Sequence, residues 1–265
     1  RGLLAAEHLL SVRYDEGSGP VIVLLHGINA DAKDWRVVID TLGSGYHCIA
    51  PDLLGFGESP KPLDIDYTAD DHTESLDATL DALGVTDPFL LVGYSLGGDI
   101  AIRYAATYPH KVRRLFMLSA PFYLPSDAYT GQGFAGDYAQ ALLFQAVWNW
   151  LARGKKSNTI AYQIATGKAE EFAAGFLRTD DVPTHWDIMG RNLKNTIGAA
   201  TFVDDLPRLD MPVTFALGIK DPIVRPDQTP ALKRLKPDLD VRRIVGLTAD
   251  HFMLVNLPER VAHEI

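Results

Sequence analysis

Short apolar runs alternate with amphipathic stretches along most of the chain. Apolar runs that end at Gly, Pro or Asp predict strands covered on both faces, as in a parallel sheet. Residues 67–83 place leucines on one face and acidic residues on the other, and residues 97–108 end before a proline, so each predicts a helix. This alternation predicts a doubly wound, mostly parallel α/β sheet. The apolar runs are VIVLLHG (21–27), YHCIAPDL (46–53), PFLLVGYS (88–95), VRRLFMLSAP (112–121), MPVTFALGIKD (211–221) and LDVRRIVGL (239–247).

The alternation is interrupted once, between about residues 120 and 206. This segment has no strand pattern, but it has two long helical stretches and many aromatic residues. We therefore expect a helical cap over residues 120–206, above the carboxyl ends of the strands, on a core made of residues 1–119 and 207–265. Within the cap, GQGFAG (131–136) matches a nucleotide-binding fingerprint but follows no predicted strand, so we interpret it as a loop.

The stretch LLVGYSLGGDI (90–100) places one hydroxyl where the strand pattern changes to a helix pattern. This is the pattern of a nucleophile elbow, in which a serine occupies a tight turn with strained backbone angles. Gly93 and Gly97 are expected there because side chains at these positions would collide across the turn. Ser95 is therefore the candidate nucleophile, and the N–H of Leu96, at the helix N-terminus, can face a developing negative charge.

A serine hydroxyl needs a base to take its proton and an acid to orient that base. Of the eight histidines, His251 follows the last predicted strand and precedes a helix predicted at LPERVAHEI (257–265). Asp221 follows the preceding strand at the same edge, so the expected triad is Ser95, Asp221 and His251, in the chain order of a known hydrolase architecture. Asp250 is the alternative acid, although a residue next to His251 in sequence normally points elsewhere. The histidine spacings predict no metal site.

Five motifs occur along the predicted core in this order: LLHG (24–27), PDLLGFGES (51–59), GYSLG (93–97), GIKDPIV (218–224) and ADHF (249–252). Together they resemble the α/β-hydrolase fold family, over about residues 7–119 and 207–265. The ordered set is much more specific than any one motif, and the predicted cap carries no matching motif.

The resemblance implies further roles around the triad. In this family the residue after the HG pair donates the second oxyanion N–H, so Ile28 joins Leu96 in the expected oxyanion hole. His26 would be a structural hydrogen-bonding group, and Asp52 and Gly55 would fix the loop in which they lie. These three residues are therefore not expected to be catalytic.

Substrate contacts are expected from loops near the predicted nucleophile. Asn29 follows Ile28 and would either face the pocket entrance or form a plain loop turn. Phe122 and Tyr123 directly follow a predicted strand, and Trp186 lies in PTHWDIM (183–189), which we interpret as a polar connection.

The resemblance implies a two-step acyl transfer that uses no cofactor. We expect a carboxylesterase acting on small to medium acyl or aryl esters through an acyl-enzyme on Ser95. The alternatives are a C–C bond hydrolase of vinylogous diketones, a lactonase, a thioesterase, an aminopeptidase, or a receptor that retains the triad and binds a small molecule. Haloalkane dehalogenases and epoxide hydrolases of this fold place Asp at the elbow, so Ser95 argues against both.

Composition limits the partners and the location. A net charge of −9, from 25 basic and 34 acidic residues, argues against nucleic acid as a partner. The longest apolar runs fall short of the roughly 18 residues of a membrane span, so no membrane partner is expected. The single cysteine, Cys48, can form no intrachain disulfide. We expect a cytoplasmic monomer or homodimer; because the chain starts at Arg1, a removed signal peptide is the alternative.

Overall fold

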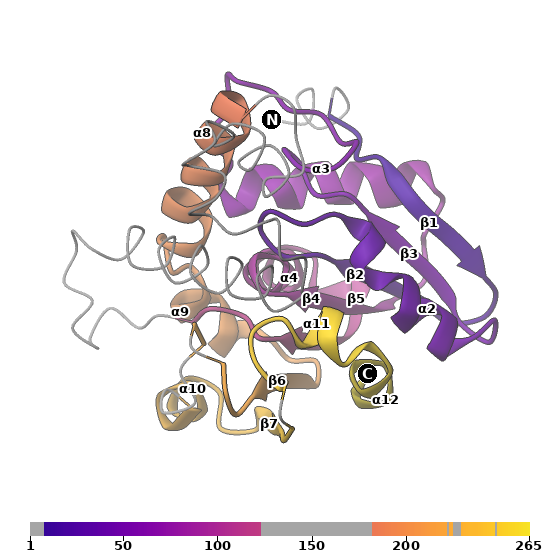
Figure 1. The fold of residues 1–265 in the computed structure, drawn as a ribbon, viewed down its shortest axis with the longest axis vertical. Helices are drawn as coiled ribbons and strands as arrows, with labels where there is room; N and C mark the ends of the chain where they lie inside the picture. Colours follow the sequence, from indigo (N-terminus) through magenta and orange to yellow (C-terminus); the bar gives the residue numbers. More distant parts are fainter. Residues whose placement is uncertain (1–7, 123–181, 222, 225–228, 247) are drawn as a thin grey trace, which may run out of the picture.

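A seven-stranded sheet runs through the molecule in the order β1-β3-β2-β4-β5-β6-β7 (Figure 1). The computed structural model describes residues 8–122 and 182–265, apart from 222, 225–228 and 247. β1 pairs antiparallel with β3, and the other neighbouring strands are parallel. The strands are β1 (Val12–Gly17), β2 (Val21–Leu25), β3 (His47–Pro51), β4 (Phe89–Tyr94), β5 (Val112–Leu118), β6 (Val213–Gly218) and β7 (Asp240–Ile244).

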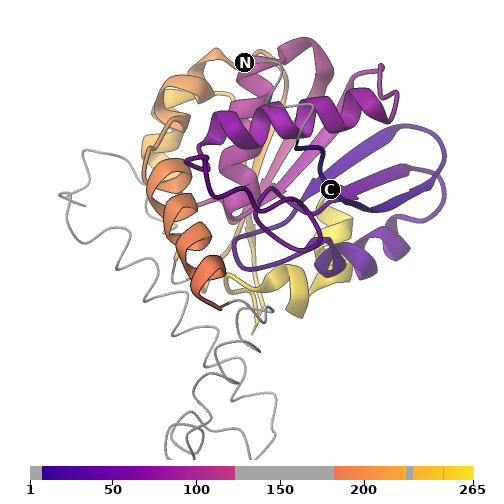
Figure 2. The ribbon, with the colours of Figure 1, turned by 90° about the horizontal axis from the view of Figure 1, so that it is seen from above.

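Helices cover both faces of this sheet (Figure 2). The hydrophobic core on one side includes side chains of α3, α4, α8, α9 and α10, and the core on the other side includes side chains of α2, α11 and α12. The strands serve both cores because alternate side chains point to opposite faces: Val23 and Leu25 join the first core, Ile22 and Leu24 the second. The helices are α2 (Arg36–Leu42), α3 (Ala69–Ala82), α4 (Leu96–Thr107), α8 (Val182–Asn192), α9 (Phe202–Asp205), α10 (Thr229–Leu235), α11 (Met253–Asn256) and α12 (Pro258–Glu264).

The strand order changes direction at β2, which lies between β3 and β4. The chain adds β3 on one side of β2 and then returns to add β4 on the other side. In open α/β sheets, a crevice forms at such a switch point outside the carboxyl ends of the strands, and ligands bind there. The loop after β2 and the turn after β4 are therefore the places to look for a site.

The predicted doubly wound, mostly parallel sheet is confirmed, and each of the six predicted strands forms. The helices predicted at residues 67–83 and 97–108 correspond to α3 and α4, and the one predicted near the end of the chain corresponds to α12. Two features differ from the sequence prediction. β1 was not predicted, and Trp186 lies within α8 rather than in a polar connection.

The last part of the predicted cap, residues 182–206, packs against the core. In α8, the Asn192 amide oxygen lies 2.7 Å from Nε2 of His72 in α3. Thr196 donates a hydrogen bond to the Tyr67 carbonyl, 2.7 Å away. The two predicted cap stretches, GQGFAG and Tyr123 lie outside the described residues, so the cap boundaries stay a prediction. Within the described part of the chain, no helix combines the length and apolarity needed to span a bilayer.

Candidate active site

Ser95 occupies a strained turn between β4 and α4, with φ 52° and ψ −121°. The glycines around it are required by close backbone contacts, as predicted. A Cβ atom on Gly97 would lie 2.6 Å from the carbonyl oxygens of both Leu25 and His26, and one on Gly93 would collide with the Gly97 carbonyl. The start of α4 therefore packs closely against the end of β2, and the turn holds Ser95 at the switch point of the sheet.

The structure brings the three predicted triad residues together in one chain of contacts. Oγ of Ser95 lies 3.0 Å from Nε2 of His251, and Nδ1 of His251 lies 3.0 Å from Oδ2 of Asp221. All three residues are at most 5% exposed. With its proton on Nδ1, the imidazole donates to Asp221 and leaves Nε2 free to accept a proton from Ser95.

Backbone contacts hold the acid and the base in this orientation. Oδ1 of Asp221 accepts hydrogen bonds from the N–H groups of Ile223 and Val224, at 2.9 and 2.8 Å, so Oδ2 is left to face His251. The carbonyl of His251 accepts a 2.7 Å hydrogen bond from the Tyr94 hydroxyl. The residue directly before the nucleophile therefore also holds the backbone of the base.

Asp250, the alternative acid, is engaged elsewhere. Its Oδ1 accepts a 2.9 Å hydrogen bond from the N–H of Phe252 and lies 3.4 Å from the Asn256 amide nitrogen. These contacts join Asp250 to the residue before the short helix α11 and to its last residue, and not to the imidazole of His251. The geometry therefore favours Asp221 as the orienting acid.

The loop after β2 lies directly against the nucleophile. A Cβ atom on Gly27 would lie only 3.1 Å from Cβ of Ser95. The chain therefore passes close to the nucleophile immediately before Ile28. Leu96 is the first residue of α4, where N–H groups have no carbonyl partner within the helix. The backbone N–H groups of Ile28 and Leu96 are thus the candidate donors to an oxyanion.

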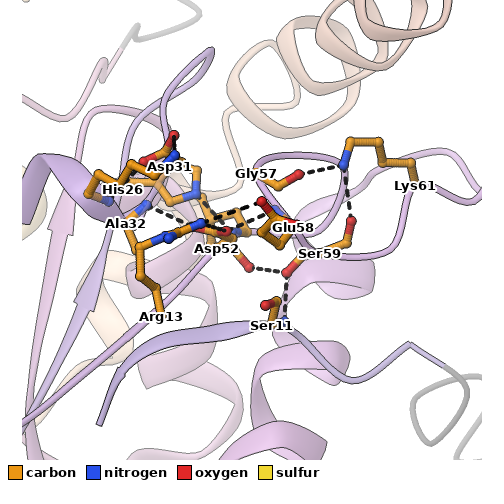
Figure 3. A network of polar contacts seen from close by, with 12 residues as sticks. Ser11, Arg13, His26, Asp31, Ala32, Asp52, Gly57, Glu58, Ser59 and Lys61 are labelled. Atoms are coloured by element: carbon orange, nitrogen blue, oxygen red, sulfur yellow. Dashed lines mark hydrogen bonds and ion pairs between the residues drawn. The ribbon is translucent and has the colours of Figure 1, made fainter. Parts of the chain in front are cut away.

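A buried carboxylate ties this loop to the one after β3 (Figure 3). Oδ1 of Asp52 accepts from the N–H of Ala32, and Oδ2 accepts from the N–H of Glu58, each at 2.8 Å. His26 adds a second link, because its Nε2 accepts a 2.8 Å hydrogen bond from the N–H of Leu53. Burial lowers the pKa of His26, which keeps the ring neutral and able to accept.

Gly55 in the loop after β3 has φ 88°, in the left-handed region. A Cβ atom there would lie 2.6 Å from the ring of Tyr67 and 2.7 Å from Ile188 in α8. His26, Asp52 and Gly55 therefore have structural contacts that fit the loop-fixing roles implied by the family resemblance.

The expected substrate-contacting residues occupy different environments. Asn29 has φ 54°, and its amide oxygen lies 3.2 Å from Nε2 of His185 in α8. Phe122 is 1% exposed and packs in the hydrophobic core, with ring centroids 4.8 Å from Phe202 and 5.1 Å from Phe215. A contact between Phe122 and a substrate therefore stays a prediction. Tyr123 and the side chain of Trp186 lie outside the described residues.

His185 was not predicted as a site residue from the sequence, where it lies in the predicted cap. The structure puts its side chain, 6% exposed, against the loop that carries Ile28. No local pattern marks this contact, because the two partners are 156 residues apart in the chain.

A second carboxyl lies one helical turn beyond the nucleophile. Asp99 is 5% exposed, and its Oδ2 is buried with no hydrogen-bond partner among the described residues. Burial raises the pKa of Asp99 well above its ordinary value, so the neutral acid is favoured. Elsewhere in the described chain, no group of three or more potential ligands is arranged to hold a metal ion.

Known proteins of several activities are similar to parts of this chain. Lipase 3 of Moraxella sp. (strain TA144) is 34% identical over 116 residues, which are 44% of this chain and 36% of the lipase. A haloalkane dehalogenase of Mesorhizobium japonicum is 45% identical over 95 residues, 36% of this chain and 30% of the dehalogenase. The 2-hydroxy-6-oxo-2,4-heptadienoate hydrolase of Pseudomonas putida is 37% identical over 110 residues, 40% of each chain. The aligned parts thus span about a third of these relatives.

Structural similarity extends over nearly the whole chain. The meta-cleavage product hydrolase of Pseudomonas fluorescens IP01 superposes with a TM-score of 0.72 at 20% identity, covering 98% of this chain and 94% of that one. Identity this low shows a shared fold and no more. The family model described as alpha/beta hydrolase fold matches residues 20–256. The chain therefore belongs to the α/β-hydrolase fold family.

Proposed function

We propose that the protein is a serine hydrolase that cleaves carboxylic esters with small to medium acyl or aryl groups. The observation that carries this proposal is the chain of 3.0 Å contacts from Ser95 through His251 to Asp221. A base next to a hydroxyl activates the nucleophile, and nearby N–H donors stabilise the charge that its attack creates.

The first half of the reaction acylates Ser95. Its hydroxyl gives the proton to Nε2 of His251 as Oγ attacks the ester carbonyl carbon, and Asp221 stabilises the charged imidazolium. The carbonyl oxygen becomes an oxyanion that accepts from the N–H groups of Ile28 and Leu96, each contributing roughly 3 kcal/mol. His251 then returns the proton to the leaving alkoxide.

The second half reverses these roles with water as the nucleophile. His251 takes a proton from water, which attacks the acyl carbonyl, and the same two N–H groups bind the second oxyanion. Collapse of this intermediate releases the acid and returns the proton to Ser95. Both halves use only water and groups of this chain.

Similarity to a lipase supports ester hydrolysis, but a second candidate has comparable support. The heptadienoate hydrolase is 37% identical over its aligned part, slightly above the 34% of the lipase. Cleavage of a C–C bond in a vinylogous diketone is therefore the alternative activity. The two activities require different substrates and can be measured separately on the same preparation.

The deciding experiment compares p-nitrophenyl esters with a dienoic diketone, using Ser95→Ala as the control. We expect turnover of the esters and loss of nearly all of it in the variant, because triad deletions cost up to about 10⁶-fold in kcat. An apolar, partly enclosed pocket under the cap would make kcat/KM rise from acetate toward butyrate or hexanoate and fall by dodecanoate. If the protein turned over the diketone faster than the esters, C–C bond hydrolysis would become the proposed activity in place of ester hydrolysis.

A further inference from the structure

Asn29 lies immediately after the candidate oxyanion donor Ile28 and has an unusual backbone conformation. Its φ of 54° is in the left-handed region, which Asn adopts more readily than most residues. The orientation of the preceding peptide group therefore depends on how this turn is held. The loop is fixed at its base by Asp52, which accepts from the N–H of Ala32, three residues further on.

Helix α8 contributes a second contact to the same loop. Nε2 of His185 lies 3.2 Å from the amide oxygen of Asn29, within hydrogen-bonding distance. Burial, together with the positive charge of Lys61, lowers the pKa of His185, so the ring is neutral near pH 7 and one nitrogen carries the only N–H. With that proton on Nε2, His185 donates to Asn29.

Aromatic packing keeps the His185 ring in place. Its edge meets Phe56 at a centroid distance of 5.7 Å and an interplanar angle of 76°. Phe56 in turn meets the ring of His26 at 6.0 Å and 88°. His185 is therefore linked to the residues that flank the Gly27–Ile28 peptide in sequence. It contacts Asn29 directly, and it is connected to His26 through the ring of Phe56.

We propose that His185 is a positioning residue for the oxyanion hole: by holding the Asn29 amide, it orients the backbone N–H of Ile28 toward the substrate carbonyl. This inference rests on the proposed serine-hydrolase function and adds a specific role for α8, which the sequence places in the cap. His185 contacts neither the reacting atoms nor Ser95 in this role. Its effect should therefore be specific to the transition state, where the oxyanion forms.

The test uses two substitutions of His185, each of which keeps one feature of the side chain and removes the other. His185→Phe keeps an aromatic ring against Phe56 but removes the donor, whereas His185→Gln keeps an N–H near the position of Nε2. Deleting an oxyanion donor costs about 10²–10³ in kcat, so a misoriented donor should cost about tenfold. We expect that loss in His185→Phe, with KM changed less than about twofold, and recovery of most of kcat in His185→Gln.

Two further measurements separate positioning from general damage. A trifluoromethyl ketone forms a tetrahedral adduct with an oxyanion, so its affinity should fall with kcat in His185→Phe. In an Asn29→Gly background, which lacks the amide, His185→Phe should cause little further loss because the two residues act as a pair. Additive losses, or equal losses in the Phe and Gln variants with an unchanged inhibitor affinity, would overturn the proposal.

The wild-type protein distinguishes this inference from the proposed function. If it turns over p-nitrophenyl esters and Ser95 reacts with a fluorophosphonate, but His185→Phe has the wild-type kcat, then only the positioning role fails. If the wild-type protein shows neither property, then the serine-hydrolase function itself fails, and the positioning role with it.

Discussion

Replacing Asp221 with asparagine exchanges one oxygen for an NH₂ group, and the surrounding hydrogen bonds determine which way the amide faces. In the native side chain, Oδ1 accepts from the N–H groups of Ile223 and Val224. Only the oxygen of an asparagine can accept these two bonds, so its NH₂ must face Nδ1 of His251. That NH₂ donates to Nδ1 and leaves the imidazole proton on Nε2, which can then no longer accept the proton of Ser95.

We therefore expect Asp221→Asn to lower kcat by about 10⁴, or about 5 kcal/mol, while the fold and KM change little. The assay is steady-state hydrolysis of p-nitrophenyl butyrate, with the melting temperature measured on the same samples. Asp250→Asn is the matched control, because Asp250 accepts from Phe252 and an asparagine oxygen can do the same. This control should stay within roughly threefold of wild type. Reversed losses would refute the reasoning and make Asp250 the acid.

The remaining predictions concern stability. Gly97→Ala should destabilise the fold by about 1–3 kcal/mol, because the new Cβ would meet the carbonyls of Leu25 and His26, whereas Gly190→Ala in α8, where a Cβ would meet no described residue within 4 Å, should not. Urea unfolding of both variants checks this, and equal effects would count against it. Burial lowers the pKa of His72 from 6.5 to about 4, so the unfolded chain binds the extra proton first and stability falls as pH drops from 6.5 toward 4. The free energy of unfolding should fall by up to about 1.4 kcal/mol per pH unit because of this group, and by less in His72→Gln. The same pH slope in the wild-type protein and in His72→Gln would contradict this assignment.

The triad could be predicted because each member follows a strand at the same edge of the sheet. Ser95 comes after β4, Asp221 after β6 and His251 after β7, so the parallel topology alone brings segments up to 156 residues apart together. Chain order and the glycine pattern around Ser95 then limited the choice to one histidine and two aspartates. The sequence favoured Asp221 over Asp250 only because a residue next to His251 in sequence normally points away from it. The hydrogen bonds of the two carboxylates also favour Asp221.

Other features left weak signals in the sequence. β1 is a partly exposed edge strand, VRYDEG, with charged residues in place of an apolar run. The first turn of α8 contains Pro183 and polar residues, which resemble a connection, although Pro is well tolerated in the first helical turn. Phe122 was expected at a pocket because it follows β5, but its position after the strand did not reveal the core rings of Phe202 and Phe215 that enclose it.

Reaction with a p-nitrophenyl alkylphosphonate tests the central claim, that His251 activates Ser95 as a nucleophile, most directly. Attack on phosphorus by Oγ of Ser95 displaces p-nitrophenolate and leaves a stable phosphonyl group, so both release and mass can be measured. We expect one equivalent of p-nitrophenolate per chain and the added mass on the peptide that contains Ser95, with both lost in Ser95→Ala and strongly slowed in His251→Ala. Modification of another residue, or equal release by the Ser95→Ala variant, would contradict it.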